Sequence, residues 1–148
     1  MIQSLLVVCV GNICRSPVGE ALLKRAFPEK KIWSAGLGAL EGHAADANAV
    51  AVAAKHGLDL SGHVAQQIQL WMCEQADLIL VMESAHVQEL SARYPLTRGK
   101  VHRVGEFCPP DAAEIPDPYR KSYETFEQTH QLIETGISHW IERIRVLS

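Results

Sequence analysis

The sequence predicts a single α/β domain, in which helices cover both faces of a parallel sheet. Short apolar runs alternate with segments whose apolar residues recur at helical spacing, as in folds whose strands are joined by crossover helices. The chain has 148 residues, 47% of them hydrophobic, which is enough for one globular core. Neither a repeat nor a shift in composition divides residues 1–148, so we expect one domain over the whole range.

Strands and helices follow one another in the apolar pattern. We expect strands over residues 4–8, 31–34, 77–82 and 101–104, of which the last is the weakest. We expect helices over residues 17–27, 45–56, 84–94 and 122–147, and irregular chain over 58–67 and 107–120.

The helices are recognised by their apolar faces and by their ends. Val18 and Leu22 belong to an apolar stripe on the first helix. Gly57 is typical of the residue that follows a helix, and Ser122 of a helix cap. Gly136 lies inside the last helix, at a cost of about 1 kcal/mol relative to Ala, so we expect close packing against it.

The segment between the first strand and the first helix predicts an anion site. Ser16 is typical of a helix cap and Pro17 of the first helical position, so the loop runs directly into a helix N-terminus. The backbone N–H groups and the helix dipole would then point at one small volume, which suits a phosphate-sized anion. Cys9 lies at the floor of this volume and Arg15 at its rim.

Composition and charge exclude several classes of partner. A net charge of −3 gives no reason to expect nucleic acid or an anionic membrane surface. The sequence contains no run of 18 apolar residues, so we expect no direct insertion into a membrane. The N-terminal segment does not resemble a signal peptide. The four cysteines form no CxxC pair and the seven histidines have no zinc-ligand spacing. We therefore expect a reducing, cytoplasmic setting with neither metal nor cofactor.

Cleavage of a phosphate monoester requires a nucleophile, fixed positive charge around the phosphoryl oxygens, and an acid for the leaving oxygen. Cys9 could be the nucleophile, because a helix N-terminus and Arg15 favour its thiolate. Arg15 could hold two phosphoryl oxygens with its planar fork. Ser16 could donate a hydrogen bond to the sulfur, cap the helix, or do both. The other phosphate ligands would be backbone N–H groups of Val10, Gly11, Asn12, Ile13 and Cys14.

The acid must come from another segment. The loop over residues 107–120 contains Asp111, Glu114 and Asp117, and spacing alone does not choose between them. Pro116 and Pro118 flank Asp117 and restrict the backbone there, which would help to hold its carboxyl over the site.

Two motifs resemble a known family. The run VCVGNICRSP, residues 8–17, resembles the active-site loop of the low-molecular-weight protein tyrosine phosphatases, and the run DPY from Asp117 resembles their general-acid loop. The resemblance covers nearly the whole chain and is strongest for bacterial members associated with polysaccharide export. It implies a four-stranded parallel sheet, a phosphocysteine mechanism, and Asp117 as the acid. It also implies that Ser34 and His63 support Asn12 through hydrogen bonds.

The resemblance also implies a substrate. That substrate is a tyrosine-phosphorylated protein, and specifically a tyrosine autokinase of polysaccharide biosynthesis or export, on which the chain would act as a monomer. Ile13, Leu40 and Tyr119 would line a slot deep enough for phosphotyrosine. In this family Ile at position 13 marks tyrosine phosphatases, whereas Thr marks arginine phosphatases.

The chain departs from the eukaryotic members of the family at two positions. Leu40 stands where they usually carry an aromatic residue, and Arg120 stands where they carry a second Tyr. Neither their substrate preference nor their control by tyrosine phosphorylation at that position therefore carries over.

Other interpretations of the loop remain open. Cys14 follows Cys9 closely in a loop that must curl, so the two could form a disulfide that acts as a redox switch. Cys14 could instead be only a small packed residue. A thioredoxin-coupled arsenate reductase shares the loop but needs two further neighbouring cysteines, and Cys73 and Cys108 are far apart in the sequence. A third possibility is a phosphate-binding regulatory module without catalytic activity.

Overall fold

The fold is built on a four-stranded parallel sheet, as the sequence predicts. The computed structural model describes residues 1–147, and its strands lie in the order β2-β1-β3-β4. The strands are β1 (Ser4–Cys9), β2 (Lys31–Gly36), β3 (Leu78–Val81) and β4 (Val101–Arg103). All three pairings are parallel, so the carboxyl ends of the strands meet at one edge of the sheet.

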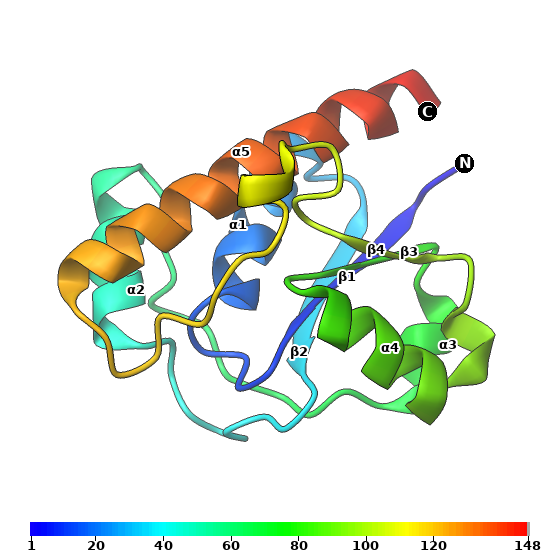
Figure 1. The fold of residues 1–148 in the computed structure, drawn as a ribbon, viewed down its shortest axis with the longest axis horizontal. Helices are drawn as coiled ribbons and strands as arrows, with labels where there is room; N and C mark the ends of the chain where they lie inside the picture. Colours follow the sequence, from blue (N-terminus) through cyan, green and yellow to red (C-terminus); the bar gives the residue numbers. More distant parts are fainter. Residues whose placement is uncertain (148) are drawn as a thin grey trace.

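Helices cover both faces of this sheet (Figure 1). They are α1 (Ser16–Ala26), α2 (Ala47–Lys55), α3 (Leu70–Gln75), α4 (Ser84–Arg93) and α5 (Tyr123–Leu147). Along β1 the side chains alternate between the two faces. Leu5 and Val7 pack in one core with α1, α2 and α5, whereas Leu6 and Val8 pack in a second core with α3 and α4. The central strand is thus buried on both sides, and the loop that follows it has a rigid base.

Most predicted elements are confirmed with small shifts at their ends, and two of these shifts have a clear local cause. The second helix begins at Ala47 rather than at residue 45, because the Asp46 carboxylate accepts the Asn48 N–H at 2.8 Å and caps it. Asp77 lies before β3 instead of inside it. Its carboxylate accepts the N–H groups of Gln3 at 2.8 Å and Ser4 at 3.2 Å, which fixes the start of β1.

Helix α3 is missing from the sequence prediction. Its six residues are too few to show a helical period. The helix buries Met72 and Cys73 against the sheet. The expectation for Gly136 is confirmed. A Cβ at this position would lie 2.6 Å from the Val104 carbonyl oxygen, so α5 approaches the end of β4 at a distance that only Gly permits. Within residues 1–147, no helix has both the length and the apolar character that crossing a bilayer requires.

Candidate active site

The Cys9 thiol lies at the carboxyl end of the central strand. Cys9 is the last residue of β1 and is only 2% exposed. Its sulfur lies 3.0 Å from the Ser16 Oγ and accepts the Ser16 N–H at 3.4 Å. The sulfur therefore faces the first turn of α1, where the helix dipole favours negative charge.

The prediction that Ser16 caps α1 is wrong. Ser16 is already the first helical residue, and no side chain caps this end of the helix. The Ser16 hydroxyl is occupied by the sulfur and by Asn12, so it is not available to the helix N–H groups. The positive end of α1 is thereby left for an anion.

The loop from residue 10 to residue 15 turns its carbonyl groups outward. The carbonyls of Val10, Gly11 and Ile13 accept hydrogen bonds from backbone N–H groups in residues 38–46, at 2.9–3.1 Å. In a planar trans peptide the C=O and the following N–H point in opposite directions. The N–H groups that follow these carbonyls therefore point toward the interior of the loop, as an anion site requires.

Asn12 holds the loop in its curled form. Its backbone has a φ of 60°, in the left-handed region that Asn tolerates better than most residues. Its Nδ2 donates to Ser16 Oγ at 2.7 Å and to Ser34 Oγ at 2.9 Å, while its Oδ1 accepts the Gln66 N–H at 2.9 Å. His63 Nε2 donates to the Asn12 carbonyl at 2.6 Å. Since Ser16 Oγ already accepts from Asn12, its own proton is available to the Cys9 sulfur.

Arg15 is buried, and one edge of its guanidinium is held in place. Only 1% of its side chain is exposed. Its Nη1 donates to Glu83 Oε2 at 2.6 Å and to the Ile115 carbonyl at 2.7 Å. Its Nε is buried and has no hydrogen-bond partner among the described residues. The Nε and Nη2 edge is the one that can bind two oxygens of a phosphoryl group.

His86 supports the carboxylate that holds Arg15. Its Nε2 lies 3.4 Å from Glu83 Oε2, and its ring is almost fully buried. Burial, followed by the positive charge of Arg15, lowers the pKa of His86, so the ring is neutral near pH 7.

Asp117 faces the same cavity from the opposite side. Its carboxylate is 47% exposed, with Oδ2 lying 3.9 Å from Arg15 Nη2 and Oδ1 accepting the Tyr119 N–H at 3.0 Å. The cavity has a volume of about 160 Å³. Its lining consists of Cys9, Val10, Gly11, Ile13, Cys14, Arg15, Gly38, Leu40, Asp117 and Tyr119. The cavity is therefore narrow, with a thiol and a guanidinium inside it and a carboxylate at its entrance.

The predicted site residues thus divide into two groups. The cavity brings together Cys9, Val10, Gly11, Ile13, Cys14, Arg15, Leu40, Asp117 and Tyr119. The hydrogen-bond network that supports the loop is formed by Asn12, Ser16, Ser34 and His63. Of the other two acidic candidates, Glu114 pairs with Arg103 at 3.0 Å, and neither it nor Asp111 lines the cavity.

Sequence reasoning missed several contributors. Glu83 lies just beyond the carboxyl end of β3, the neighbour of β1, and this position could have marked it. Ile115 acts through its backbone carbonyl, which no sequence pattern reveals. Ser34 donates a short hydrogen bond to Glu20, which extends the network behind Asn12 onto α1.

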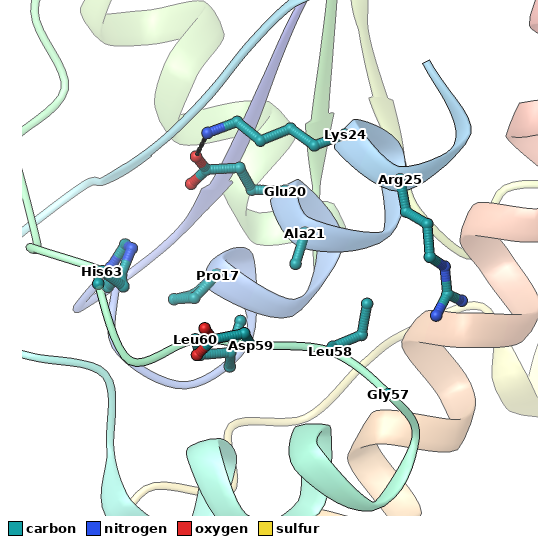
Figure 2. Close-up of a pocket in the computed structure, with 11 residues that line it drawn as sticks. Pro17, Glu20, Ala21, Lys24, Arg25, Gly57, Leu58, Asp59, Leu60 and His63 are labelled. Atoms are coloured by element: carbon teal, nitrogen blue, oxygen red, sulfur yellow. Dashed lines mark ion pairs between the residues drawn. The ribbon is translucent and has the colours of Figure 1, made fainter. Parts of the chain in front are cut away.

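A larger hollow lies along α1 (Figure 2). Its volume is about 450 Å³, and it lies between α1 and the irregular segment over residues 57–63. Two of its lining residues form an ion pair, in which Lys24 Nζ lies 2.6 Å from Glu20 Oε2 (Figure 2). His63 lines this hollow and also contacts Asn12, so the hollow borders the back of the loop. No cysteine is among its lining residues, whereas Cys9 and Cys14 line the smaller cavity.

Known proteins resemble this chain in sequence and in fold. The sequence model described as "Low molecular weight phosphotyrosine protein phosphatase" matches residues 4–146. The chain is 50% identical over 144 residues to the low molecular weight protein-tyrosine-phosphatase Wzb of Escherichia coli, with 97% of each chain covered.

Two solved structures are similar over almost the whole chain. The crystal structure of the Erwinia amylovora tyrosine phosphatase AmsI is 48% identical with a TM-score of 0.93, covering 97% of this chain and 93% of that one. Vibrio vulnificus Wzb in complex with benzylphosphonate is 42% identical with a TM-score of 0.91, covering 97% of this chain and 99% of that one.

Proposed function

The chain belongs to the low molecular weight phosphotyrosine protein phosphatase family, and we propose that Cys9, Arg15 and Asp117 carry out its phosphotyrosine hydrolysis. The observation that carries this assignment is the convergence of a thiol, a buried guanidinium and a carboxylate on one cavity. Each group occupies the position that one part of the reaction needs.

The first step transfers the phosphoryl group to the enzyme. The Cys9 thiolate attacks phosphorus, a sulfur–phosphorus bond forms, and the bond to the phenolic oxygen breaks. Asp117 donates its proton to that oxygen, so tyrosine leaves as a neutral phenol. The Nε and Nη2 edge of Arg15 and the loop N–H groups stabilise the charge on the phosphoryl oxygens during this transfer.

The second step returns the enzyme to its starting state. The Asp117 carboxylate accepts a proton from water, and the water oxygen attacks phosphorus. The sulfur–phosphorus bond breaks, inorganic phosphate leaves, and the thiolate is regenerated. The Ser16 hydroxyl, 3.0 Å from the sulfur, stabilises the negative charge that returns to Cys9.

Selection for phosphotyrosine is assigned to the entrance of the cavity. Ile13, Leu40 and Tyr119 line it, and the thiol lies at the buried end. A flat aromatic ring can span this depth, whereas the shorter phosphoserine side chain would leave its phosphorus short of the sulfur. The benzylphosphonate in the Vibrio vulnificus structure is a phenyl ring joined through a CH₂ group to a phosphonate, and a slot of this kind suits such a molecule.

The finer parts of the proposal concern the partner and the setting. We infer that the substrate is a tyrosine autokinase of polysaccharide biosynthesis or export, because the motifs most resemble the bacterial members associated with that process. We further propose that the chain acts as a monomer in the cytoplasm. The four thiols, none of which is in a disulfide, are consistent with a reducing compartment.

A Cys9–Cys14 disulfide stays a prediction. Both residues are free thiols and both line the cavity. Burial first, and then the carboxylates of Asp46 and Asp117, raise the pKa of the Cys14 thiol. We therefore expect Cys9 to be oxidised first and Cys14 to attack it slowly.

The arsenate reductase alternative finds no support in the placement of the other thiols. Cys73 is buried against the opposite face of the sheet in α3, and Cys108 lines a separate hollow beside α5. Neither lines the cavity that holds Cys9, so neither is placed to relay a disulfide from it.

The test is phosphate release from a phosphotyrosine peptide, with phosphoserine and phosphoarginine peptides as controls. Wild type and Cys9→Ser would be assayed side by side, under reducing conditions and without added metal. We expect turnover of the phosphotyrosine peptide by wild type alone. Turnover by Cys9→Ser would contradict the phosphocysteine mechanism, and comparable turnover of phosphoserine would contradict the depth argument.

A further inference from the structure

His130 is a buried side chain without a hydrogen-bond partner. It lies on α5 and is only 2% exposed, and neither of its ring nitrogens has a partner among the described residues. Leaving a buried polar group unpaired is destabilising, so the few such groups in a folded protein call for an explanation. A ring nitrogen of His130 that has no hydrogen-bond partner can bind a metal ion.

Two further ligand groups face His130. Glu134 lies one turn along α5, with its Oε2 3.7 Å from His130 Nε2. His56 follows the last residue of α2, and its Nδ1 lies 3.9 Å from the same carboxylate oxygen. The two imidazole rings stack with their centroids 4.3 Å apart, and the three ligand atoms all lie within 4.8 Å of one another. Helices α2 and α5 run side by side here (Figure 1).

We propose that His56, His130 and Glu134 form a binding site for a divalent transition-metal ion of the Zn²⁺ type. Two imidazole nitrogens and one carboxylate oxygen form a ligand set that suits Zn²⁺, with water in the fourth position. Ca²⁺ and Mg²⁺ prefer oxygen ligands and would be held poorly.

The observed distances are close to those that an ion requires. Tetrahedral Zn²⁺ with bonds of about 2.0–2.1 Å places its ligand atoms about 3.3 Å apart. The two distances to Glu134 Oε2 exceed this by roughly half an ångström. The two imidazole nitrogens lie within 4.8 Å of each other, so side-chain rotation must also shorten that distance to close the site. The stacked His56 ring must turn to aim Nδ1 at the ion. It can do so because His56 is exposed and belongs to the end of a helix.

The ion would connect two elements that support the catalytic loop. His130 borders a small cavity that Cys14 and Pro118 also line, so the site lies behind both the anion loop and the acid loop. Binding only to the folded state raises stability in proportion to the logarithm of the ion concentration above Kd. The role assigned here is therefore structural, and the hydrolysis of phosphotyrosine does not depend on it.

The histidine spacing in the sequence does not reveal this group. His130 and Glu134 are four residues apart on one helix, but the third ligand comes from a different helix far away in the chain. Only the packing of α2 against α5 brings it into place.

The experiment is a titration with Co²⁺, followed by visible absorption and then by displacement with Zn²⁺. The Cys9→Ser chain serves as the parent, so that the nucleophilic thiolate cannot compete. We expect one Co²⁺ per chain, with d–d bands of nitrogen and oxygen ligation, and a rise in Tm with Zn²⁺. His56→Gln and Glu134→Gln should each weaken binding at least about tenfold.

The controls separate this site from adventitious binding. His139→Gln, on the same helix, should leave the Co²⁺ affinity unchanged. His56 is exposed, so its substitution should not disturb the fold, and circular dichroism would verify this. Three results would overturn the proposal. They are a sulfur-to-cobalt charge-transfer band, a Co²⁺ affinity in His56→Gln and Glu134→Gln that equals that of the parent chain, and no Co²⁺ binding at millimolar concentration.

Discussion

Replacing Ser16 with Ala should slow the second half of the reaction. The substitution removes the hydroxyl 3.0 Å from the Cys9 sulfur but keeps the backbone N–H that the sulfur accepts at 3.4 Å. A hydrogen bond to a charged group contributes about 1.5–3 kcal/mol. Since about 1.36 kcal/mol corresponds to a factor of ten, the rate at which the thiolate leaves phosphorus should fall by about 10- to 150-fold.

The first half of the reaction should suffer less. A less stabilised thiolate is a smaller fraction of the protein but a stronger nucleophile, so the two effects partly cancel. Phosphocysteine should therefore accumulate in Ser16→Ala. Rapid-quench kinetics with p-nitrophenyl phosphate would detect this as a burst of nitrophenol that approaches one equivalent per chain.

Ser34→Ala is the matched control. It removes the other hydroxyl that accepts from Asn12 Nδ2 but leaves the Ser16–Cys9 contact in place. It should cost about 1 kcal/mol of stability and produce no burst. If Ser16→Ala shows the wild-type kcat and no burst, the hydroxyl does not stabilise the departing sulfur and the mechanism above loses that part.

Three further predictions concern the acid, the packing of α5 and the start of β1. Asp117→Asn should slow aryl phosphate hydrolysis most for leaving groups of high pKa, whereas equal slowing across such a series would remove Asp117 from the acid role. Gly136→Ala should lower stability by about 1–3 kcal/mol in denaturant titrations despite better helix propensity, because its Cβ would lie 2.6 Å from the Val104 carbonyl oxygen. Gly62→Ala, whose Cβ meets nothing within 4 Å, should change stability little. The pKa of Asp77 is lowered mainly by the hydrogen bond from the Gln3 N–H. The Asp77 carboxylate should therefore stabilise the fold fully at pH values above its ordinary pKa of 3.8, and this stabilisation should be lost as the pH falls through the lowered pKa. The Tm difference between wild type and Asp77→Asn should therefore be present at pH 7 and vanish in acid; a constant difference would contradict this.

The fold could be predicted from the sequence wherever the apolar pattern was long or clearly bounded. The run over residues 5–8 and the stripe on α1 fixed the central strand and its crossover helix. Helix α3 could not be predicted, because six residues span less than two turns. The start of α2 was misplaced because Ala45 favours a helix, while the cap formed by Asp46 is a competing local interaction.

The residues that line the candidate site could be predicted from the sequence, but most of the contacts that hold them in place could not. Cys9 and Arg15 stand out because they frame a loop that joins a strand to a helix. Ser16 was misread as a cap, because nothing in the sequence shows that its hydroxyl faces a sulfur seven residues earlier in the chain. The ion pair between Glu83 and Arg15 depends on the pairing of β1 with β3, which brings together segments far apart in the sequence.

Because the loop carbonyls point outward, the main-chain N–H groups rather than side chains face the interior of the loop. The anion ligands that we propose for the loop are main-chain N–H groups, and every amino acid except proline carries one. We therefore expect substitutions at Val10 or Ile13 to alter the wall of the cavity without deleting a phosphate ligand. On this proposal the substrate range can change through the cavity entrance while the phosphoryl chemistry is retained.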